Sequence, residues 1–158
     1  MKKLIYRLIH PLRAAYWTIF RAKTIGVTCL IECDAKLLMI RHTYGHRRWT
    51  FPGGGVKKGE TSEEAVQREC REEVGIELKN QIYLGEYFNN NELDMGHCFV
   101  CRVPDFYFRI DGEEVAEAGW FDLANIPTLH APAVNKVLDL YQRPGPPRYG
   151  NENCRPLM

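Results

Sequence analysis

Residues 54–76, GGVKKGETSEEAVQRECREEVGI, are the stretch that decides the fold. Within it, Thr61 and Glu64 have the spacing of a helix N-cap with its capping box. Gly75 is a typical helix stop, because glycine readily adopts the left-handed conformation that ends a helix. The stretch therefore predicts a helix that begins after Thr61 and ends at Gly75.

Three consecutive glycines, 53–55, lie between a short predicted strand and this helix. We expect them to form a loop in which the backbone approaches a phosphate closely, since helix-start N–H groups favour anions. Gly53 and Gly54 are therefore candidate substrate-binding positions. The loop is not a Walker A loop, because Glu60 stands where the phosphate-binding lysine of that motif is needed.

Three glutamates of the predicted helix, Glu69, Glu72 and Glu73, have the spacing i, i+3 and i+4, which places them on one side. Three like charges at this spacing repel one another, and a shared hard divalent cation would explain their proximity. The alternative is a solvated acidic helix face. An apolar stripe on the same helix places the carboxylates at the edge of the core: Val66, Cys70 and Val74.

The pattern Gly54, five residues, Glu60, seven residues and Arg68-Glu-Cys-Arg-Glu-Glu-Val-Gly-Ile76 resembles the complete Nudix box of MutT-like hydrolases. The resemblance implies an α/β fold, an α/β/α sandwich with a mixed β-sheet. It also implies hydrolysis of a diphosphate linkage in a nucleoside diphosphate derivative, by water attack on phosphorus. Mg²⁺ is the implied cofactor, with Mn²⁺ as the alternative.

Carried over position by position, the resemblance makes Glu69 and Glu73 the principal metal ligands. Glu72 is a further ligand or the general base, and Arg68 orients the carboxylates. Glu60 supports the loop. A Nudix-fold nucleotide-binding or regulatory domain without catalysis is the alternative, and such domains tend to lose the acidic set that this chain keeps.

A further metal ligand in this family often comes from a later loop, where Glu113, Glu114 and Glu117 are the candidates. Glu114 is favoured, because Glu117 begins a predicted strand. Arg41, Arg48 and Trp49 are candidate substrate-binding residues. The group beyond the diphosphate stays open.

Outside the box, alternating strand and helix patterns predict one domain over residues 24–143. We expect a hairpin of Thr24–Ile31 and Lys36–Ile40 with a turn at Asp34-Ala35. The other predicted elements are strands at Trp49–Phe51, Ile82–Phe88, His97–Val103 and Glu117–Phe121, a loop over 89–94, and a helix at Val134–Tyr141.

The two ends of the chain lie outside the resemblance. Residues 1–23 carry six basic and no acidic side chains and have apolar residues at helical spacing, which predicts an amphipathic helical extension. This extension either lies on an anionic membrane surface, as a peripheral contact, or packs on its own domain or across a homodimer. Residues 144–158 are rich in Pro, Gly and Asn and predict a flexible tail.

Composition excludes several classes of protein. The 158 residues carry a net charge of +1, and the basic excess is confined to the N-terminal segment. The acidic remainder argues against nucleic acid as a partner. Six cysteines include a lone Cys98-x-x-Cys101 pair on a predicted strand, where residues three apart face opposite sides. We therefore expect reduced, packed thiols and a cytoplasmic protein.

Overall fold

The computed structural model describes residues 24–89, 94–110 and 112–143. The predicted helical extension, 1–23, and the predicted tail, 144–158, lie outside these residues. No helix in the described part of the chain is long and apolar enough to cross a membrane.

The described residues form a mixed seven-stranded sheet with one α-helix against each face. The helices are α2 (Ser62–Val74) and α3 (Ala133–Gln142), with a short 3-10 turn, η1, at Leu123–Asn125. The strands are β1 (Thr24–Cys33), β2 (Lys36–His42), β3 (Trp49–Thr50), β4 (Gly53–Gly55), β5 (Ile82–Phe88), β6 (Asp94–Arg102) and β7 (Val115–Asp122).

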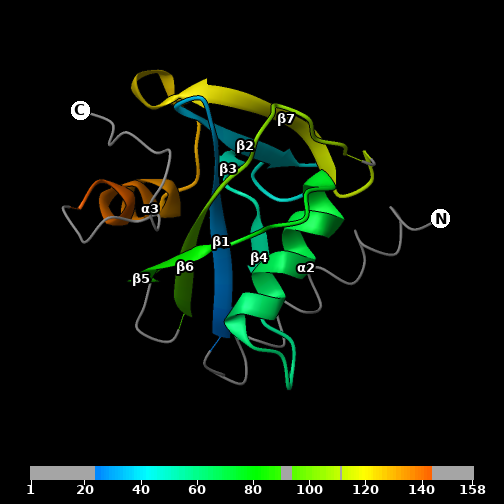
Figure 1. The fold of residues 1–158 in the computed structure, drawn as a ribbon, viewed down its shortest axis with the longest axis vertical. Coiled ribbons are helices and arrows are strands. Elements are labelled where there is room, and N and C mark those ends of the chain that lie inside the picture. Colours follow the sequence, from blue (N-terminus) through cyan, green and yellow to red (C-terminus); the bar gives the residue numbers. More distant parts are fainter. Residues whose placement is uncertain (1–23, 90–93, 111, 144–158) are drawn as a thin grey trace.

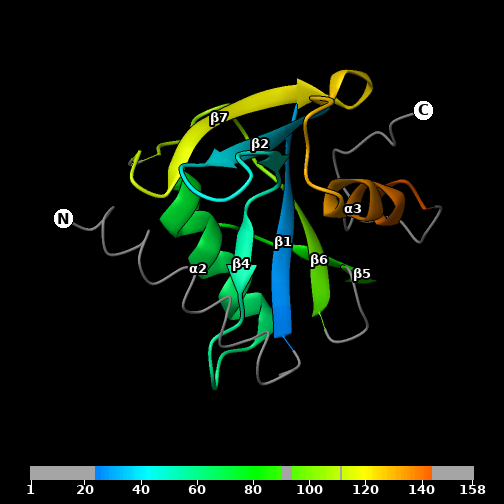
Figure 2. The same cartoon turned by 180° about the vertical axis from the view of Figure 1, so that it is seen from behind.

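Strand β1 organises the sheet (Figures 1 and 2). On one side it runs parallel to β6 along its length, from the pair Thr24–Asp94 to the pair Glu32–Arg102. On the other side it pairs with β4 near its beginning and with β2 at its end, both antiparallel. Strand β5 joins the far side of β6, and β2 also carries β3 and β7. The second edge of β1 is therefore shared between two strands, and β4 lies directly beneath α2.

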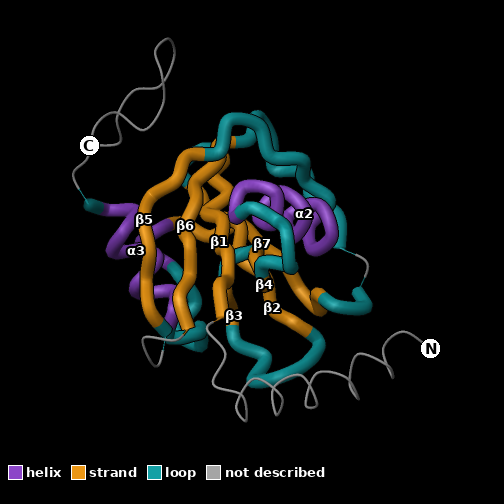
Figure 3. Tube along the Cα trace, turned by 90° about the horizontal axis from the view of Figure 1, so that it is seen from below, coloured by secondary structure: helices purple, strands orange, loops and turns teal. Residues whose placement is uncertain are grey.

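Helices α2 and α3 lie on opposite faces of the sheet (Figure 3), and a hydrophobic cluster lies between each helix and the sheet. Buried side chains of α2 pack with alternate residues of β1, such as Val27, Cys29 and Ile31. Buried side chains of α3 pack with the other face, including Leu30 and Val100. Period-two alternation along the strands supplies both faces with apolar residues. The predicted α/β/α sandwich with a mixed sheet is confirmed.

The predicted first hairpin is present, and both strands are two residues longer than predicted. Its two turn residues, Asp34 and Ala35, both have positive φ values, 44° and 63°. A two-residue turn with this geometry matches the twist of the flanking strands. The strand predicted from His97 also begins earlier, at Asp94, so Asp94 does not belong to the preceding loop.

The prediction that the three glycines form a loop is wrong, because they form strand β4, paired with Gly26–Thr28 of β1. A Cβ atom at Gly53 would lie 2.1 Å from the Val27 carbonyl oxygen, so only glycine fits there. Helix α2 begins seven residues after Gly55, at Ser62. Gly53 thus allows close packing against β1, a role that the sequence interpretation of a phosphate loop missed.

The cysteines follow the expectation of packed, reduced thiols in the described residues. Cys29, Cys33, Cys70, Cys98 and Cys101 are all free and buried. Cys98 and Cys101 belong to opposite hydrophobic clusters, so the C-x-x-C pair does not face one site. Cys154 lies outside the described residues.

Candidate active site

Helix α2 is fixed at both ends by the caps predicted from its sequence. The Glu64 backbone N–H donates to the Thr61 hydroxyl at 3.2 Å, and the Thr61 N–H donates to the Glu64 carboxylate at 2.8 Å. Gly75 ends the helix with φ at 68°, and its N–H donates to the Arg71 carbonyl at 3.2 Å. These caps hold the helix in register over β4, which fixes the positions of its side chains.

The three glutamates of the box share one side of α2 but differ sharply in burial. The Glu73 side chain is 2% exposed, and the Glu72 side chain is 49% exposed. Glu69 lies between these extremes, with a side chain that is 14% exposed. The set therefore runs from the core outward to solvent, with Glu73 deepest.

Glu73 is buried with little compensation for its charge. Its carboxylate accepts one hydrogen bond from the Gly53 backbone N–H at 2.8 Å, and it lies 3.6 Å from Nε2 of His42. Burial raises the pKa of Glu73 well above its ordinary value, and only the Gly53 N–H opposes this among the main causes. Glu69 lies close enough that its charge raises the pKa further.

Glu32 is a useful contrast, because it is the other buried charged side chain among the described residues. Its carboxylate accepts from the Arg102 guanidinium at 2.8 Å and from the Tyr141 hydroxyl at 3.1 Å. Glu32 is thus a satisfied structural ion pair that ties β1 to β6 and α3. Within the described part of the chain, Glu73 has no arginine or lysine partner of this kind, and uncompensated buried charges are typical of functional sites.

Glu69 lies against the glycine strand. A Cβ atom at Gly54 would approach the Glu69 carboxyl carbon to 2.5 Å, so the carboxylate occupies the space that a side chain would fill. Burial raises the pKa of Glu69, although the Arg68 guanidinium, 2.6 Å away, opposes the shift. Gly53 and Gly54 therefore contact Glu73 and Glu69 respectively.

We predict that Gly54→Ala displaces the Glu69 carboxylate and lowers metal-dependent activity about 10- to 100-fold, the usual cost of disturbing a ligand's support. Stability should change little, because the clash is with the end of a flexible side chain. Gly55→Ala is the matched control, since a Cβ there meets nothing within 4 Å. Steady-state kinetics and thermal unfolding of both variants test this. Equal activities of the two variants would contradict it.

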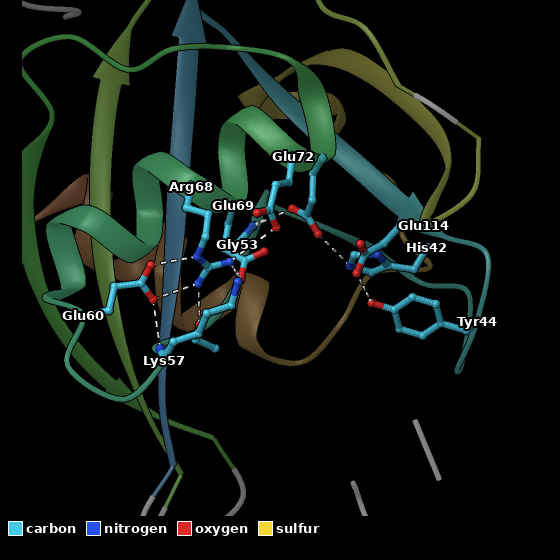
Figure 4. Close-up of polar contacts among 11 residues, drawn as sticks. His42, Tyr44, Gly53, Lys57, Glu60, Arg68, Glu69, Glu72 and Glu114 are labelled. Atoms are coloured by element: carbon cyan, nitrogen blue, oxygen red, sulfur yellow. Dashed lines mark hydrogen bonds and ion pairs between the residues drawn. The ribbon is translucent and has the colours of Figure 1, made fainter. Parts of the chain in front are cut away.

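Arg68 connects the acidic set to the turn before the helix (Figure 4). Its guanidinium donates to Glu60 at 2.7 and 2.9 Å, to Glu69 at 2.6 Å and to the Gly55 carbonyl at 2.9 Å. Its contact with Glu72, the partner expected from helical spacing, is the longest at 3.4 Å. Arg68 lowers the pKa of Glu60 to about 2, with help from the Lys57 backbone N–H.

Three residues lie across from Arg68 in Figure 4: His42 at the end of β2, Tyr44 just after it and Glu114 just before β7. The Tyr44 hydroxyl donates to the Glu114 carboxylate at 3.1 Å, and the Tyr44 ring stacks on His42 with centroids 5.0 Å apart. Burial and the charge of Glu114 raise the pKa of Tyr44, so the hydroxyl keeps its proton. The charge of Glu114 also raises the pKa of Glu73, which places Glu114 near the box glutamates.

The structure places the other two later-loop acids elsewhere. Glu113 contributes its backbone carbonyl, which accepts from the Thr43 hydroxyl at 2.8 Å. Glu117 lies within β7 and forms an ion pair with Arg41. Of the three candidates, only Glu114 therefore has a carboxylate that the described contacts place near the glutamates of the box.

Arg41 and Trp49, predicted to contact substrate, lie apart from the glutamates. The Arg41 guanidinium lies over the Trp49 ring, 5.8 Å from its centroid. Trp49 packs at the edge of the α3-side cluster, against Phe121, whereas the glutamates lie on the α2 side. Arg48 is exposed in the segment before β3.

Comparison with known proteins identifies the group to which these features belong. The model of the NUDIX domain matches residues 21–141, which include the whole sheet, most of the two-helix framework and every box residue. The chain belongs to the Nudix family. The predicted family membership is therefore confirmed.

Two Nudix relatives show the extent of the similarity. The chain is 37% identical over 111 residues to the ADP-ribose pyrophosphatase of Methanocaldococcus jannaschii, covering 66% of this chain and 65% of the relative. It is 31% identical over 101 residues to the CTP pyrophosphohydrolase of Escherichia coli, covering 60% of this chain and 72% of the relative. The first of these relatives is thus matched over slightly less than two thirds of its length.

The Nudix fold is also seen in solved structures. The MutT NUDIX hydrolase of Burkholderia pseudomallei superposes with a TM-score of 0.68 at 24% identity, covering 74% of this chain and 96% of that chain. At this identity the similarity establishes the fold, and the site must be argued from its own residues.

Nudix hydrolases generally use divalent metal ions, and the donor set of this site fits such an ion. The carboxylates of Glu69, Glu73 and Glu114 supply oxygen atoms, which hard divalent cations prefer. Glu73 is a buried acid whose charge a cation would stabilise. In the described residues no three acidic, His or Cys side chains lie close enough together to hold a metal ion as they stand. Arg68 donates to the Glu69 carboxylate and the Gly53 N–H donates to that of Glu73, so binding of an ion would require these side chains to move.

His42 and Tyr44 gained definite positions only in the structure. They follow an apolar run, Leu37–Ile40, which is buried on both faces and hides the alternation of the strand. His42 is the last residue of β2 and Tyr44 lies in the bend that follows, so strand alternation does not relate the two side chains. No feature of the sequence shows which side faces Glu73.

Proposed function

We propose that this Nudix protein hydrolyses a diphosphate linkage in a nucleoside diphosphate derivative, with Mg²⁺ as cofactor and Mn²⁺ as its substitute. The observation that carries the proposal is the burial of Glu73 beside Glu69, with His42 3.6 Å away but no arginine or lysine partner like that of Glu32 among the described residues. A buried, poorly compensated carboxylate lowers stability and is retained where chemistry requires it.

The proposed roles follow the gradient of burial. Glu69 and Glu73 hold the metal, with Glu114 as the ligand from the later segment. Glu72 has the most exposed carboxylate of the box, which suits a further ligand or a base that exchanges protons with solvent. Arg68 orients Glu69, while Glu60 holds Arg68 in place.

The reaction is a displacement at phosphorus. A water oxygen forms a bond to one phosphorus as the bond from that phosphorus to the bridging oxygen breaks. The bridging oxygen leaves on the second phosphate, and a carboxylate of the site, with Glu72 as the candidate, accepts the water proton. When bound, a divalent metal ion neutralises phosphate oxygens and lowers the pKa of a water molecule.

The names of the relatives suggest the first substrates to test. ADP-ribose and CTP are natural probes, together with nucleotide sugars and dinucleoside polyphosphates. We expect phosphate-containing products only when Mg²⁺ or Mn²⁺ is added, at rates at least ~10³-fold above those in excess chelator, since the metal provides several kcal/mol of charge stabilisation. Chromatography of the products with and without metal measures this.

The competing function is a Nudix-fold nucleotide-binding or regulatory domain without catalysis. Binding of a nucleotide by calorimetry, combined with the absence of metal-dependent products across the whole panel, would favour that function and reject the proposed one.

A further inference from the structure

An open groove of about 490 Å³ lies along the flank of α2, outside the acidic set. Its volume falls within the ~300–1,000 Å³ typical of small-molecule sites. Residues of the turn before the helix form one wall, and α2 forms the other. Its charged lining residues are Lys57, Lys58, Glu60, Glu64, Arg68 and Arg71.

The groove carries an excess of positive charge. Its two acids are already engaged, because Glu60 accepts from Arg68 at 2.7 Å and Glu64 accepts from the Thr61 N–H at 2.8 Å. The Arg68 guanidinium already forms ion pairs with Glu60 and Glu69. Lys58 and Arg71 are exposed and, within the described part of the chain, no carboxylate lies within ion-pair distance of either.

The lysines lie on a defined turn. The Glu60 N–H donates to the Lys57 carbonyl at 3.1 Å, and Gly59 has φ at 82°, as at the third position of a type II turn. The Glu60 carboxylate closes the same turn by accepting from the Lys57 N–H at 2.9 Å. The backbone that presents Lys57 and Lys58 is therefore ordered by the same residue that holds Arg68.

The groove adjoins the proposed metal site through Arg68. The Arg68 side chain contacts Glu60 on the groove side and Glu69 on the metal side, and Figure 4 shows Lys57 and Glu60 on the far side of Arg68 from Glu72. Arg71 lies one turn further along the helix, and residues at this spacing are ~5–6 Å apart. The groove and the proposed metal site are therefore neighbours on the helix, with Arg68 shared between them.

We propose that this groove binds a further phosphate group of the substrate, beyond the diphosphate that is hydrolysed. This inference rests on the proposed function and narrows its substrate to nucleoside diphosphate derivatives that carry an additional phosphate. Lys58 and Arg71 determine the preference for a substrate with the additional phosphate, because hydrogen bonds from charged side chains to phosphate are stronger than those between neutral groups.

The test compares ADP-ribose with ADP-ribose 2′-phosphate, which differ by one phosphate monoester. With full-length protein and Mg²⁺, we expect a higher kcat/KM for the phosphorylated compound. The double variant Lys58→Ala/Arg71→Ala should lower that value about tenfold and leave the value for ADP-ribose unchanged. Lys79→Ala/Arg109→Ala is the matched control, because it removes the same charge from exposed residues outside the groove.

A binding experiment on the metal-free protein adds a readout that does not depend on catalysis. Calorimetric titration with inorganic tripolyphosphate should show about tenfold weaker binding to the groove variant than to the control variant.

The inference would be overturned if the ratio of kcat/KM for the two substrates were the same in the wild type and in the groove variant. If tripolyphosphate binding falls while the ratios stay equal, the groove binds free anions and the substrate assignment is wrong. Absence of activity on every substrate would instead reject the proposed function.

Discussion

Glu73→Gln is expected to abolish most of the metal-dependent activity while making the metal-free protein more stable. Activity should fall at least ~10³-fold, which corresponds to ~4 kcal/mol of lost transition-state stabilisation. The free energy of unfolding without metal should rise by about 1 kcal/mol at pH 8, because the amide removes a buried charge that one backbone N–H stabilises. The opposite signs of the two effects identify Glu73 as a functional and not a structural acid.

The stability difference should depend on pH. Burial raises the pKa of Glu73 in the folded protein, so the metal-free fold binds a proton more tightly than the unfolded chain. Stability of the wild type should therefore fall as pH rises from the unfolded pKa, ~4.3, through the raised folded pKa. The glutamine side chain of the variant has no proton to lose, so the advantage of Glu73→Gln should grow with pH.

Urea unfolding of both proteins in chelator, at several pH values, measures this difference. Glu72→Gln is the matched control, since its carboxylate is half exposed and its replacement should change stability by less than ~0.5 kcal/mol. A metal-free Glu73→Gln protein that is less stable than wild type at pH 8 would show that Glu73 is a structural residue.

Arg68→Ala is expected to have the largest effect on stability of any change in the site. The substitution leaves the carboxylates of Glu60 and Glu69, which are 15% and 14% exposed, without their guanidinium partner. Loss of these contacts should lower the melting temperature by roughly 5–15 °C. Arg68→Lys should recover only part of the loss, because lysine lacks the planar fork of donors.

The effect of Arg68→Ala should diminish in acid. The folded pKa of Glu60 is lowered to about 2 chiefly by its hydrogen bonds from Arg68, from a reference value of 4.5. A group whose folded pKa is lowered contributes stability above its unfolded pKa, and the contribution is lost as pH falls toward the folded value. The wild type and the variant should therefore converge between about pH 4.5 and pH 2.

Thermal and urea unfolding at pH 7 and pH 3 test this pair of expectations. Arg71→Ala is the control for the loss of an exposed arginine from the same helix, and it should cost less than ~0.5 kcal/mol. A stability loss that is equal at the two pH values would assign the effect of Arg68 to packing and not to its carboxylate partners.

Local rules determined helix α2 and the side of it that carries the glutamates. The capping box and Gly75 set its ends, and the i, i+3, i+4 spacing set the acidic side, because these features depend only on residues within a few positions of one another. The same is true of the first hairpin. The box pattern identified the family, because few other folds place the same glycines, glutamates and arginine at this spacing.

The tertiary structure decided how deeply each glutamate is buried and what meets it. Glu73 lies closest to the apolar stripe of α2 and Glu72 farthest from it, and the packing of α2 against β1 and β4 turns that order into a difference in burial. The same packing turned the predicted glycine loop into strand β4, and the pairing of β2 with β7 brought Tyr44 to Glu114. The extent of burial, and with it the free-energy cost of a buried charge, depends on residues far apart in the sequence, so spacing along one helix predicts the order of burial but not its extent.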